Sequence, residues 1–420
     1  MDKIIINGGN RLVGEVNITG AKNAALGILP ATILSSDTCV IENVPDIQDM
    51  KNYITILEKL GADVSRNEHG DLVVNAKNVS IDNLGLIEEE STRMRASYYL
   101  LGVFLTKYKK IRLPLPGGCD IGARPIDMHI KGFEALGASV VLKNGYINIS
   151  ADELKGTSIY LDVVSVGATI NIMLAAVFAE GTTTIENSAK EPHVVDIANF
   201  LNLMGAKIKG AGTDVIKVKG VESLKGCTYS VVPDQITAGT YMIAAAATKG
   251  DVLIKNVIPE HLDPITAKLV EMGHEVILND DSIQVIGKEP KHSISVITLT
   301  YPGFPTDLQQ PMGVLMCLAS GVSSITETIF ENRFRYVHEL IKMGADIKVN
   351  GNVAYFHGGK TLSGAKLKAT DLRAGAAMLI AGLVAEGKTE VSELKHLDRG
   401  YDNIVSKLKA LGADIVRVDE

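Results

Sequence analysis

A unit of about 70 residues occurs six times along this chain of 420 residues, and this repeat limits the possible folds more than any other feature. Each copy contains a helix-like segment that ends in Leu or Met and is followed by glycine and a strand-like run. A glycine directly after a helix typically adopts the left-handed conformation that ends it. A period near 70 is too long for the common solenoids, whose repeats span about 20–50 residues. The repeat therefore predicts six compact α/β units, marked by Gly61, Gly137, Gly205, Gly273, Gly344 and Gly412.

A second series of segments recurs in step with these glycines. Its members are rich in alanine and apolar throughout, which predicts one buried helix in each unit. Several lead into a glycine and then a strand, as Glu180-Gly181 does before Thr182. Each unit should therefore run helix, strand, loop, helix, strand, strand. The six predicted helices cover residues 21–34, 93–106, 167–180, 236–249, 308–320 and 372–386.

The two ends of the chain complement each other. The last unit stops after the strand-like run 414–418, without its later strands. Residues 3–6 and 14–18 are surplus strand-like segments that precede the first unit. These N-terminal strands could complete the sixth unit, because a strand can be supplied from any part of the chain.

This complementarity predicts two domains of three units each. Residues 22–229 would form one domain, and residues 1–21 with 230–420 would form the other. The chain would cross between them twice, near residues 20–22 and 230–233. Ligand sites often lie between domains, so we expect the functional site in the interdomain cleft.

Composition and motifs exclude several classes of protein. The formal net charge is -7 and no run is rich in Lys or Arg, which argues against a nucleic-acid partner. No apolar run reaches about 18 residues and the N-terminus lacks a signal-peptide layout, so we expect a cytoplasmic protein without a membrane partner. There is no P-loop, GxGxxG or HExxH motif. The cysteines form no CxxC pair and predict neither a disulfide framework nor a zinc site; they are Cys39, Cys119, Cys227 and Cys317.

One of these cysteines has an unusual setting. Cys119 lies in the loop 113–129, which is rich in glycine and proline, and Arg124 follows five residues later. A nearby cation lowers the pKa of a thiol and prepares it for proton transfer or nucleophilic attack. An arginine in such a loop suits a phosphate or carboxylate. The alternative is an inert thiol, and a cysteine protease would need a partner histidine, for which only His129 is near. The other three cysteines are interpreted as small buried hydrophobic residues.

Basic residues mark the starts of two predicted helices. Lys22 and Asn23 open the first apolar helix, where free N–H groups and the helix dipole favour an anion. Arg95 lies where the second apolar helix begins. A solvated first-turn lysine and an ion-paired arginine are the structural alternatives to an anion site.

Two aspartates and two arginines occupy matching places in the last two units. Asp307 and Asp371 directly precede the fifth and sixth apolar helices. Both fit a helix N-cap, and Asp307 also fits a general base beside a substrate hydroxyl. Arg333 and Arg399 occupy the loops that correspond to the Cys119 loop of unit two. Equivalent loops of a pseudo-symmetric fold can face one cleft, which would bring these residues together.

The chain resembles the UDP-N-acetylglucosamine 1-carboxyvinyltransferases, which are enolpyruvyl transferases, over essentially its whole length. The most specific motif is the loop Leu115 to Pro125, Leu-Pro-Gly-Gly-Cys followed by Gly-Ala-Arg-Pro; the related shikimate-pathway transferase lacks this cysteine loop. The resemblance implies an α/β protein with the two-domain inverted α/β barrel of enolpyruvyl transferases, three units in each domain, and no metal or organic cofactor. Further matching motifs lie at residues 20–24, 94–97, 165–169, 303–307, 331–334, 371–373 and 398–401.

The resemblance also implies a reaction. The enolpyruvyl group of phosphoenolpyruvate would be transferred to the 3′-hydroxyl of UDP-N-acetylglucosamine, through a tetrahedral intermediate and with release of phosphate. This is the first committed step of peptidoglycan synthesis, and so serves cell-wall biogenesis, cell shape and cell division. Cys119 would protonate C3, can add covalently to phosphoenolpyruvate, and would be the target of fosfomycin. Asp307 would accept the hydroxyl proton, and Lys22, Arg124 and Arg399 would hold the phosphate and carboxylate.

The remaining implied contacts concern the UDP-sugar and domain closure. Arg333 and Arg373 would support closure or substrate binding.

Gln48, Val163 and Gln235 depart from the family pattern, in which basic residues are frequent at these places. Three alternatives stay open: the shikimate-pathway transferase, a catalytically silent paralogue that binds UDP-sugar, and a repeat-built scaffold. The implied UDP-sugar contacts are Asn23, Arg95, Arg124, Pro125, Ile126, Asp127, Met128, Val163, Val164, Ser165, Val166, Asp307 and Ile329.

Overall fold

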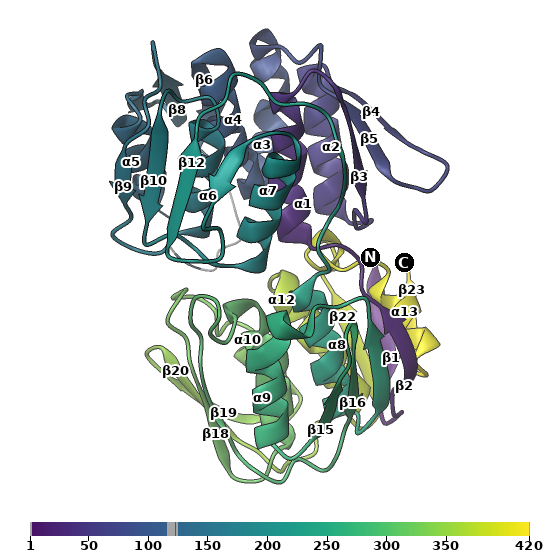
Figure 1. Cartoon of the computed structure of the whole chain (residues 1–420). Coiled ribbons are helices and arrows are strands. Elements are labelled where there is room, and N and C mark those ends of the chain that lie inside the picture. The colour runs from purple at the N-terminus through teal and green to yellow at the C-terminus, as the bar shows by residue number, and fades with distance from the viewer. Residues whose placement is uncertain (1, 116–121, 123–124, 420) are drawn as a thin grey trace.

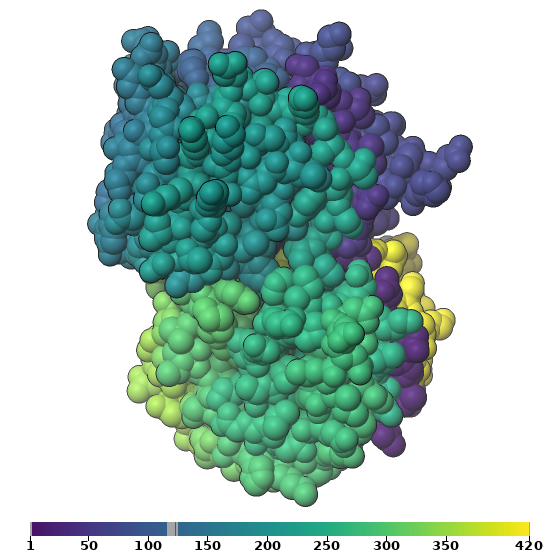
Figure 2. All heavy atoms as spheres, in the orientation of Figure 1, coloured from purple at the N-terminus to yellow at the C-terminus, as the bar shows by residue number. Residues whose placement is uncertain are grey.

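The computed structural model describes residues 2–115, 122 and 125–419. Figure 1 shows two lobes of mixed α/β structure, with the N-terminal strands β1 (Lys3–Asn7) and β2 (Val13–Asn17) placed beside the C-terminal part of the chain. Figure 2 shows that the lobes touch and that the molecular surface narrows between them. In the described part of the chain, no helix has the length and apolar character needed to cross a membrane.

Six apolar helices form the centres of the two lobes, as the alanine-rich segments predicted. Nearly every residue of these helices is buried, as expected for a helix that is hydrophobic on all sides. In one lobe α4 packs on α6 and on α1, and in the other α8, α10 and α12 pack on one another. Short 3-10 turns at 95–98 and 306–308 lead into α4 and α10. The six helices are α1 (Lys22–Ala31), α4 (Tyr99–Tyr108), α6 (Val166–Ala176), α8 (Gln235–Ala247), α10 (Gln309–Leu318) and α12 (Leu372–Val384).

A second helix in each unit ends at the repeated glycine. All six glycines have φ between 91° and 112°, so the predicted left-handed helix ends are confirmed. A side chain at φ values in this range would strain the backbone, which explains why the position is glycine in every unit. One further helix, α3 (Glu88–Arg93), lies between units one and two. The second helices are α2 (Gln48–Leu60), α5 (Asp127–Ala135), α7 (Pro192–Leu203), α9 (Asp263–Glu271), α11 (Val337–Lys342) and α13 (Ile404–Ala410).

Each unit contributes one open sheet. No described sheet closes on itself, so the inverted barrel consists of open sheets around buried helices. In five units a short parallel strand, which the predicted unit lacked, joins the outer side of the first strand. In units one to three, the strand orders are β13 (Thr228–Ser230), β3 (Thr38–Glu42), β5 (Leu72–Asn75), β4 (Asp63–Arg66) for unit one; β6 (Lys110–Pro114), β8 (Tyr146–Ser150), β7 (Ser139–Lys143) for unit two; and β9 (Ser158–Tyr160), β10 (Thr182–Glu186), β12 (Val215–Lys219), β11 (Lys207–Lys209) for unit three. In units four to six, they are β2, β14 (Asp251–Lys255), β16 (Ser282–Ile286), β15 (Glu275–Leu278) for unit four; β17 (Ser295–Ile297), β18 (Val322–Thr326), β20 (Val353–His357), β19 (Asp346–Asn350) for unit five; and β21 (Lys366–Lys368), β22 (Lys388–Ser392), β1, β23 (Asp414–Val418) for unit six.

The two N-terminal strands belong to different units, which corrects one expectation. β1 pairs with β22 and β23 and completes the sixth sheet, as predicted. β2 instead lies parallel to β14 in the fourth sheet. It takes the place that the short parallel strands take in other units. Because the sequence pattern did not reveal those parallel strands, nothing in it assigned β2 to unit four.

Two separate hydrophobic cores underlie the lobes. One core draws on residues between 21 and 231, which we call the first lobe; the other draws on residues 4–18 and 236–415, which we call the second lobe. The two chain crossings run side by side between them. The Ala21 N–H donates to the Val232 carbonyl at 2.7 Å, and the Asp234 N–H donates to the Thr19 carbonyl at 3.0 Å. We propose that each core defines a domain, with residues 22–229 in one and 1–21 with 230–420 in the other.

Candidate active site

A cavity of about 740 Å³ lies between the two lobes. Residues at the N-terminal end of every apolar helix, or of the turn that leads into it, line this cavity. Helix N-termini carry unsatisfied N–H groups and the positive end of the helix dipole, so the cavity favours anionic ligands. The lining residues at these six ends are Lys22, Arg95, Val166, Gln235, Asp307 and Leu372.

Most of the predicted site residues lie on this cavity. Cys119 and Arg124 fall outside the described residues. Ile126 does not line the cavity, since its side chain packs on the core of the first lobe. Gln235 lines it, whereas Gln48 is a surface residue whose amide bonds Asn52 at 2.8 Å. The predicted residues on the cavity are Lys22, Asn23, Arg95, Pro125, Asp127, Met128, Val163, Val164, Ser165, Val166, Asp307, Ile329, Arg333, Arg373 and Arg399.

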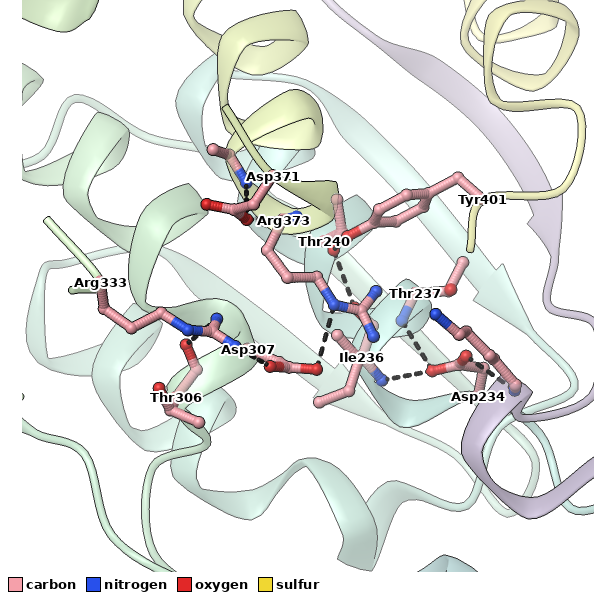
Figure 3. A network of polar contacts seen from close by, with 12 residues as sticks. Asp234, Ile236, Thr237, Thr240, Thr306, Asp307, Arg333, Asp371, Arg373 and Tyr401 are labelled. Carbon is pink, nitrogen blue, oxygen red and sulfur yellow. Dashed lines mark hydrogen bonds and ion pairs between the residues drawn. The ribbon is translucent and has the colours of Figure 1, made fainter. Parts of the chain in front are cut away.

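Asp307 lies between two arginines, as Figure 3 shows. Arg333 donates from Nη2 to Oδ1 at 2.7 Å, and Arg373 donates from Nε to Oδ2 at 3.1 Å. The two arginine side chains are only 5% and 4% exposed. Burial alone would raise the pKa of Asp307, but Arg373 and Arg333 outweigh it and hold the pKa below its ordinary value. The carboxylate is therefore ionised, and both of its oxygens are engaged.

The structure separates the two interpretations that the sequence left open for the aspartates. Asp371 is an N-cap, because its Oδ1 accepts the N–H groups of Arg373 and Ala374 at 2.9 and 3.0 Å. Asp307 instead lies inside the turn 306–308, and its two carboxylate oxygens accept from Arg333 and Arg373. The N-cap interpretation is thus confirmed for Asp371 and wrong for Asp307. The carboxylate of Asp307 is directed to arginines on the cleft wall instead.

A second ion cluster joins the lobes through Asp49. This aspartate lies in the first turn of α2 and is 2% exposed. Lys22 Nζ lies 2.8 Å from its Oδ2, and Arg399 Nε lies 2.9 Å from its Oδ1. Burial would raise the pKa of Asp49, but the two cations lower it. Lys22 and Asp49 come from the first lobe and Arg399 from the second, so the cluster spans the interlobe boundary.

Sequence reasoning gave no role in the cleft to Asp49 and to several other ionisable residues that line it. An acid in a first helical turn is ordinary, so Asp49 carried no distinguishing signal. Glu191, His129 and His193 also line the cavity. Burial lowers the pKa of each histidine to about 4, which leaves both neutral near pH 7.

Replacing Asp49 with asparagine should destabilise the protein by about 3–5 kcal/mol. The change leaves the buried ammonium of Lys22 and the guanidinium of Arg399 without their shared counter-ion, and breaking one side of a buried ion pair costs roughly 3–5 kcal/mol. Because the folded-state pKa of Asp49 is lowered, the stabilisation is present above its ordinary value of 3.8 and is lost as the pH falls further. Urea unfolding at pH 7 and at a pH below 3.8 measures both effects.

The matched control for this variant is Asp46→Asn. Asp46 pairs with Lys51 at 3.0 Å, but both side chains are more than half exposed. Such surface pairs contribute about 0.2–1 kcal/mol at most, so the control should unfold close to the wild-type midpoint. Equal midpoints for the two variants would contradict a structural role for the Asp49 cluster.

Comparison with known proteins identifies the class first. The family model described as EPSP synthase (3-phosphoshikimate 1-carboxyvinyltransferase) matches residues 6–408. The enolpyruvyl transferase NikO from Streptomyces tendae has a TM-score of 0.87 and 26% identity, with 99% of each chain covered. An EPSP synthase from Acinetobacter baumannii shares the fold with a TM-score of 0.76 at 17% identity, over 100% of each chain. The expected enolpyruvyl transferase fold is confirmed.

The curated relatives narrow the class. A UDP-N-acetylglucosamine 1-carboxyvinyltransferase from Clostridium botulinum is 58% identical over 100% of both chains. UDP-N-acetylglucosamine 1-carboxyvinyltransferase 3 from Caldanaerobacter subterraneus is 56% identical over 100% of both chains. The chain belongs to the EPSP synthase family and, within it, to the UDP-N-acetylglucosamine 1-carboxyvinyltransferases.

Proposed function

We propose that this protein transfers the enolpyruvyl group of phosphoenolpyruvate to the 3′-hydroxyl of UDP-N-acetylglucosamine and releases phosphate. The observation that carries the proposal is the set of buried cations around one interlobe cavity, in a chain that matches transferases of this name over its full length. The reaction is the first committed step of peptidoglycan synthesis. A cytoplasmic location stays a prediction.

The charges of the cleft suit the proposed donor. Phosphoenolpyruvate carries a phosphate and a carboxylate, and each favours charge-assisted hydrogen bonds from lysine or arginine. Lys22 and Arg399 lie on either side of the single carboxylate of Asp49. A bound phosphate would add negative charge where two cations now share one counter-ion. Arg124 would add a third cation, but its role rests on the sequence alone.

The proposed acceptor would span the two lobes. In the first lobe, Ser165 caps α6 by accepting the Ala168 N–H at 3.3 Å. The N-terminus of α6 also lines the cavity, and helix N-termini bind phosphate groups readily, so we place the diphosphate there. In the second lobe, Ile329 and Asp307 line the same cavity. The sugar would thus lie between the lobes with its 3′-hydroxyl near Asp307.

The proposed chemistry has two steps. In the addition, the 3′-oxygen bonds to C2 of phosphoenolpyruvate, the π electrons take a proton at C3, and the hydroxyl proton leaves. Cys119 would supply the C3 proton and Asp307 would accept the hydroxyl proton. In the elimination, the bond from C2 to the phosphate oxygen breaks and C3 loses a proton, which restores the double bond. Atoms and charge balance without a metal or redox partner.

The geometry of Asp307 adds a condition to this mechanism. Both carboxylate oxygens accept hydrogen bonds from arginines. A carboxylate with a lowered pKa is a weak base, so one oxygen must turn from its arginine to the substrate hydroxyl. Phosphoenolpyruvate or the diphosphate would provide the anion that draws Arg333 or Arg373 away.

The first experiment measures phosphate release from phosphoenolpyruvate with UDP-N-acetylglucosamine, with and without fosfomycin. We expect release that depends on the UDP-sugar and is blocked irreversibly by a single adduct on Cys119. Release with shikimate 3-phosphate as the acceptor would support the shikimate-pathway alternative instead. Binding of UDP-sugar without release would indicate the silent paralogue.

The other cysteines should not react with fosfomycin. Burial raises the pKa of Cys39, of Cys227 to about 11 and of Cys317 to about 12. Such thiols hold little thiolate at neutral pH, and the thiolate is the nucleophile. Peptide mass spectrometry therefore has three internal controls. An adduct spread over several cysteines would contradict the assignment of Cys119.

A further inference from the structure

A buried acid behind the cleft wall has five hydrogen-bond donors directed at it. Glu327 follows β18 directly and is 4% exposed. It does not line the cavity, but Thr306, Ile329 and Phe330 do. Its Oε1 accepts from Thr298 Oγ1 at 2.9 Å, Ile329 N at 2.8 Å and Phe330 N at 3.2 Å, and its Oε2 accepts from Thr306 Oγ1 at 2.8 Å and Gln309 Nε2 at 3.1 Å.

The internal repeat shows what this position does elsewhere. Three other units have asparagine directly after the corresponding strand, at a φ of 57°. Each asparagine donates to the carbonyl that follows the paired parallel strand, and so ties that strand to the sheet. The three bonds run from Asn43 to Val231, from Asn187 to Leu161 and from Asn256 to Ile18, at 2.8, 2.8 and 2.6 Å.

Unit five departs from this pattern. The Thr298 carbonyl, which follows β17, accepts from the Thr328 hydroxyl instead. Glu327 is not among the residues with positive φ, and only one of its five bonds, the one from Thr298 Oγ1, reaches the residue that follows β17. A buried carboxylate is costly unless it is fully hydrogen-bonded, so a simple structural need would have been met by the asparagine of the other units. The five bonds of Glu327 therefore point to another task.

The bonded groups belong to the two segments that carry cleft residues of the second lobe. Thr306 directly precedes Asp307, and the Thr306 carbonyl also accepts from Arg333 at 3.3 Å. The N–H groups of Ile329 and Phe330 fix the turn that brings Ile329 to the cavity. One carboxylate thus sets the distance between the proposed base and the proposed sugar contact.

We propose that Glu327 is a positioning residue that holds Asp307 and the turn 328–330 in register for the acceptor sugar. This inference rests on the proposed function. Lys22 and Arg399 are held by Asp49, whereas Glu327 holds the segments of Asp307 and Ile329, so its loss should affect the acceptor much more than phosphoenolpyruvate. A displacement of about 1 Å in a catalytic group can cost about 10²-fold in rate.

The test compares Glu327→Ala, Glu327→Asp and Glu327→Gln by steady-state kinetics, with each substrate varied in turn. Alanine removes every acceptor, and aspartate is too short to reach both segments. We expect both to lower kcat/KM for UDP-N-acetylglucosamine by about 10²-fold, with KM for phosphoenolpyruvate within about threefold of wild type. Glutamine keeps an oxygen for the two backbone N–H groups. Its amide can donate to the Thr306 hydroxyl and to Gln309 Oε1, which has no hydrogen-bond partner among the described residues. It should restore most activity.

The matched control is Glu393→Ala, at the corresponding position after β22 in unit six. Glu393 has a φ of 62° and pairs with Lys395 at 2.9 Å near the surface. It should change neither kinetic constant. Thermal melting of each variant shows whether lost activity comes from a misplaced Asp307 or from a protein that does not fold. If Glu327→Ala does not fold, Glu327→Asp still tests the proposal.

The outcomes separate this inference from the function on which it rests. A wild-type enzyme without turnover would overturn the function itself. The positioning role would be overturned if the wild type turns over and Glu327→Asp has the same kinetic constants. It would also be overturned if the substitution lowers kcat/KM equally for both substrates. Loss of activity in Glu327→Gln equal to that in the alanine variant would also overturn it, because the charge and not the hydrogen-bond geometry would then be decisive.

Discussion

Replacing Asp307 with asparagine should lower kcat by about 10³-fold, because general-base catalysis contributes roughly 10²–10⁴-fold. Asparagine keeps the size of the side chain but cannot accept the 3′-hydroxyl proton. KM for UDP-N-acetylglucosamine should change much less, since the other predicted contacts remain. Steady-state phosphate release and calorimetric binding of the UDP-sugar measure the two effects separately.

The same variant also removes a counter-ion, which must be distinguished from loss of a base. Asp307 neutralises Arg333 and Arg373, so a purely structural role would weaken folding and substrate binding together. Asp2→Asn is a suitable control, because it breaks an aspartate–arginine pair with Arg417 on the surface. Turnover of Asp307→Asn within tenfold of wild type would rule out the general base.

The pH dependence gives a second check on Asp307. Its pKa is held below the ordinary value of 3.8 by Arg373 and Arg333, so the base form persists at every pH above that value. The profile of kcat/KM, which reports groups of the free enzyme, should show no loss from Asp307 between about pH 8 and pH 5. A group that titrates in this range must be another one.

Replacing Cys119 with serine should abolish most turnover, by about 10²-fold or more, whereas Cys119→Asp should keep activity and resist fosfomycin. A proton donor works best when its pKa lies near the working pH. The pKa of a thiol can fall toward neutrality beside a cation and a carboxylic acid can protonate C3, but a serine hydroxyl is far too weak an acid. Aspartate has no sulfur for the epoxide to alkylate.

The decisive measurement is the difference in turnover between Cys119→Ser and Cys119→Asp. Both variants replace the same residue, so a difference in turnover between them reports proton donation and not a change in the fold. Cys317→Ser is the control, because Cys317 is a buried thiol that donates to the Gly313 carbonyl at 3.3 Å within α10. An active Cys119→Ser enzyme would contradict the proposed role of the thiol.

Much of the site could be predicted because its residues stand at repeated places in the units. Lys22, Arg95, Asp307 and Arg373 all lie at the starts of apolar helices, and the repeat aligns those starts. The pattern could not distinguish a cap from a base, since Asp307 and Asp371 precede their helices in the same way. Only the hydrogen bonds of the folded chain decided that Asp371 caps α12 while Asp307 faces two arginines.

Asp49 and Glu327 show why the rest could not be predicted. Each is an acid near the start of a helix or the end of a strand, where acids are common. Their importance comes from partners far along the chain, Arg399 for Asp49 and Thr298 with Thr306 for Glu327. A single sequence does not show which hydrogen-bond donors from distant segments contact a given carboxylate in the folded protein.

The sequence by itself determined the six units, their apolar helices and the glycines that end the second helices, because these follow from local periodicity and from the backbone freedom of glycine. Its resemblance to a family also gave the expected reaction. Only the tertiary structure decided that β2 joins the fourth sheet, that the helix N-termini share one cavity, and which carboxylates neutralise which cations. The physical reason is that strand pairing and buried ion pairing depend on contacts between distant segments, and local sequence patterns do not specify those contacts.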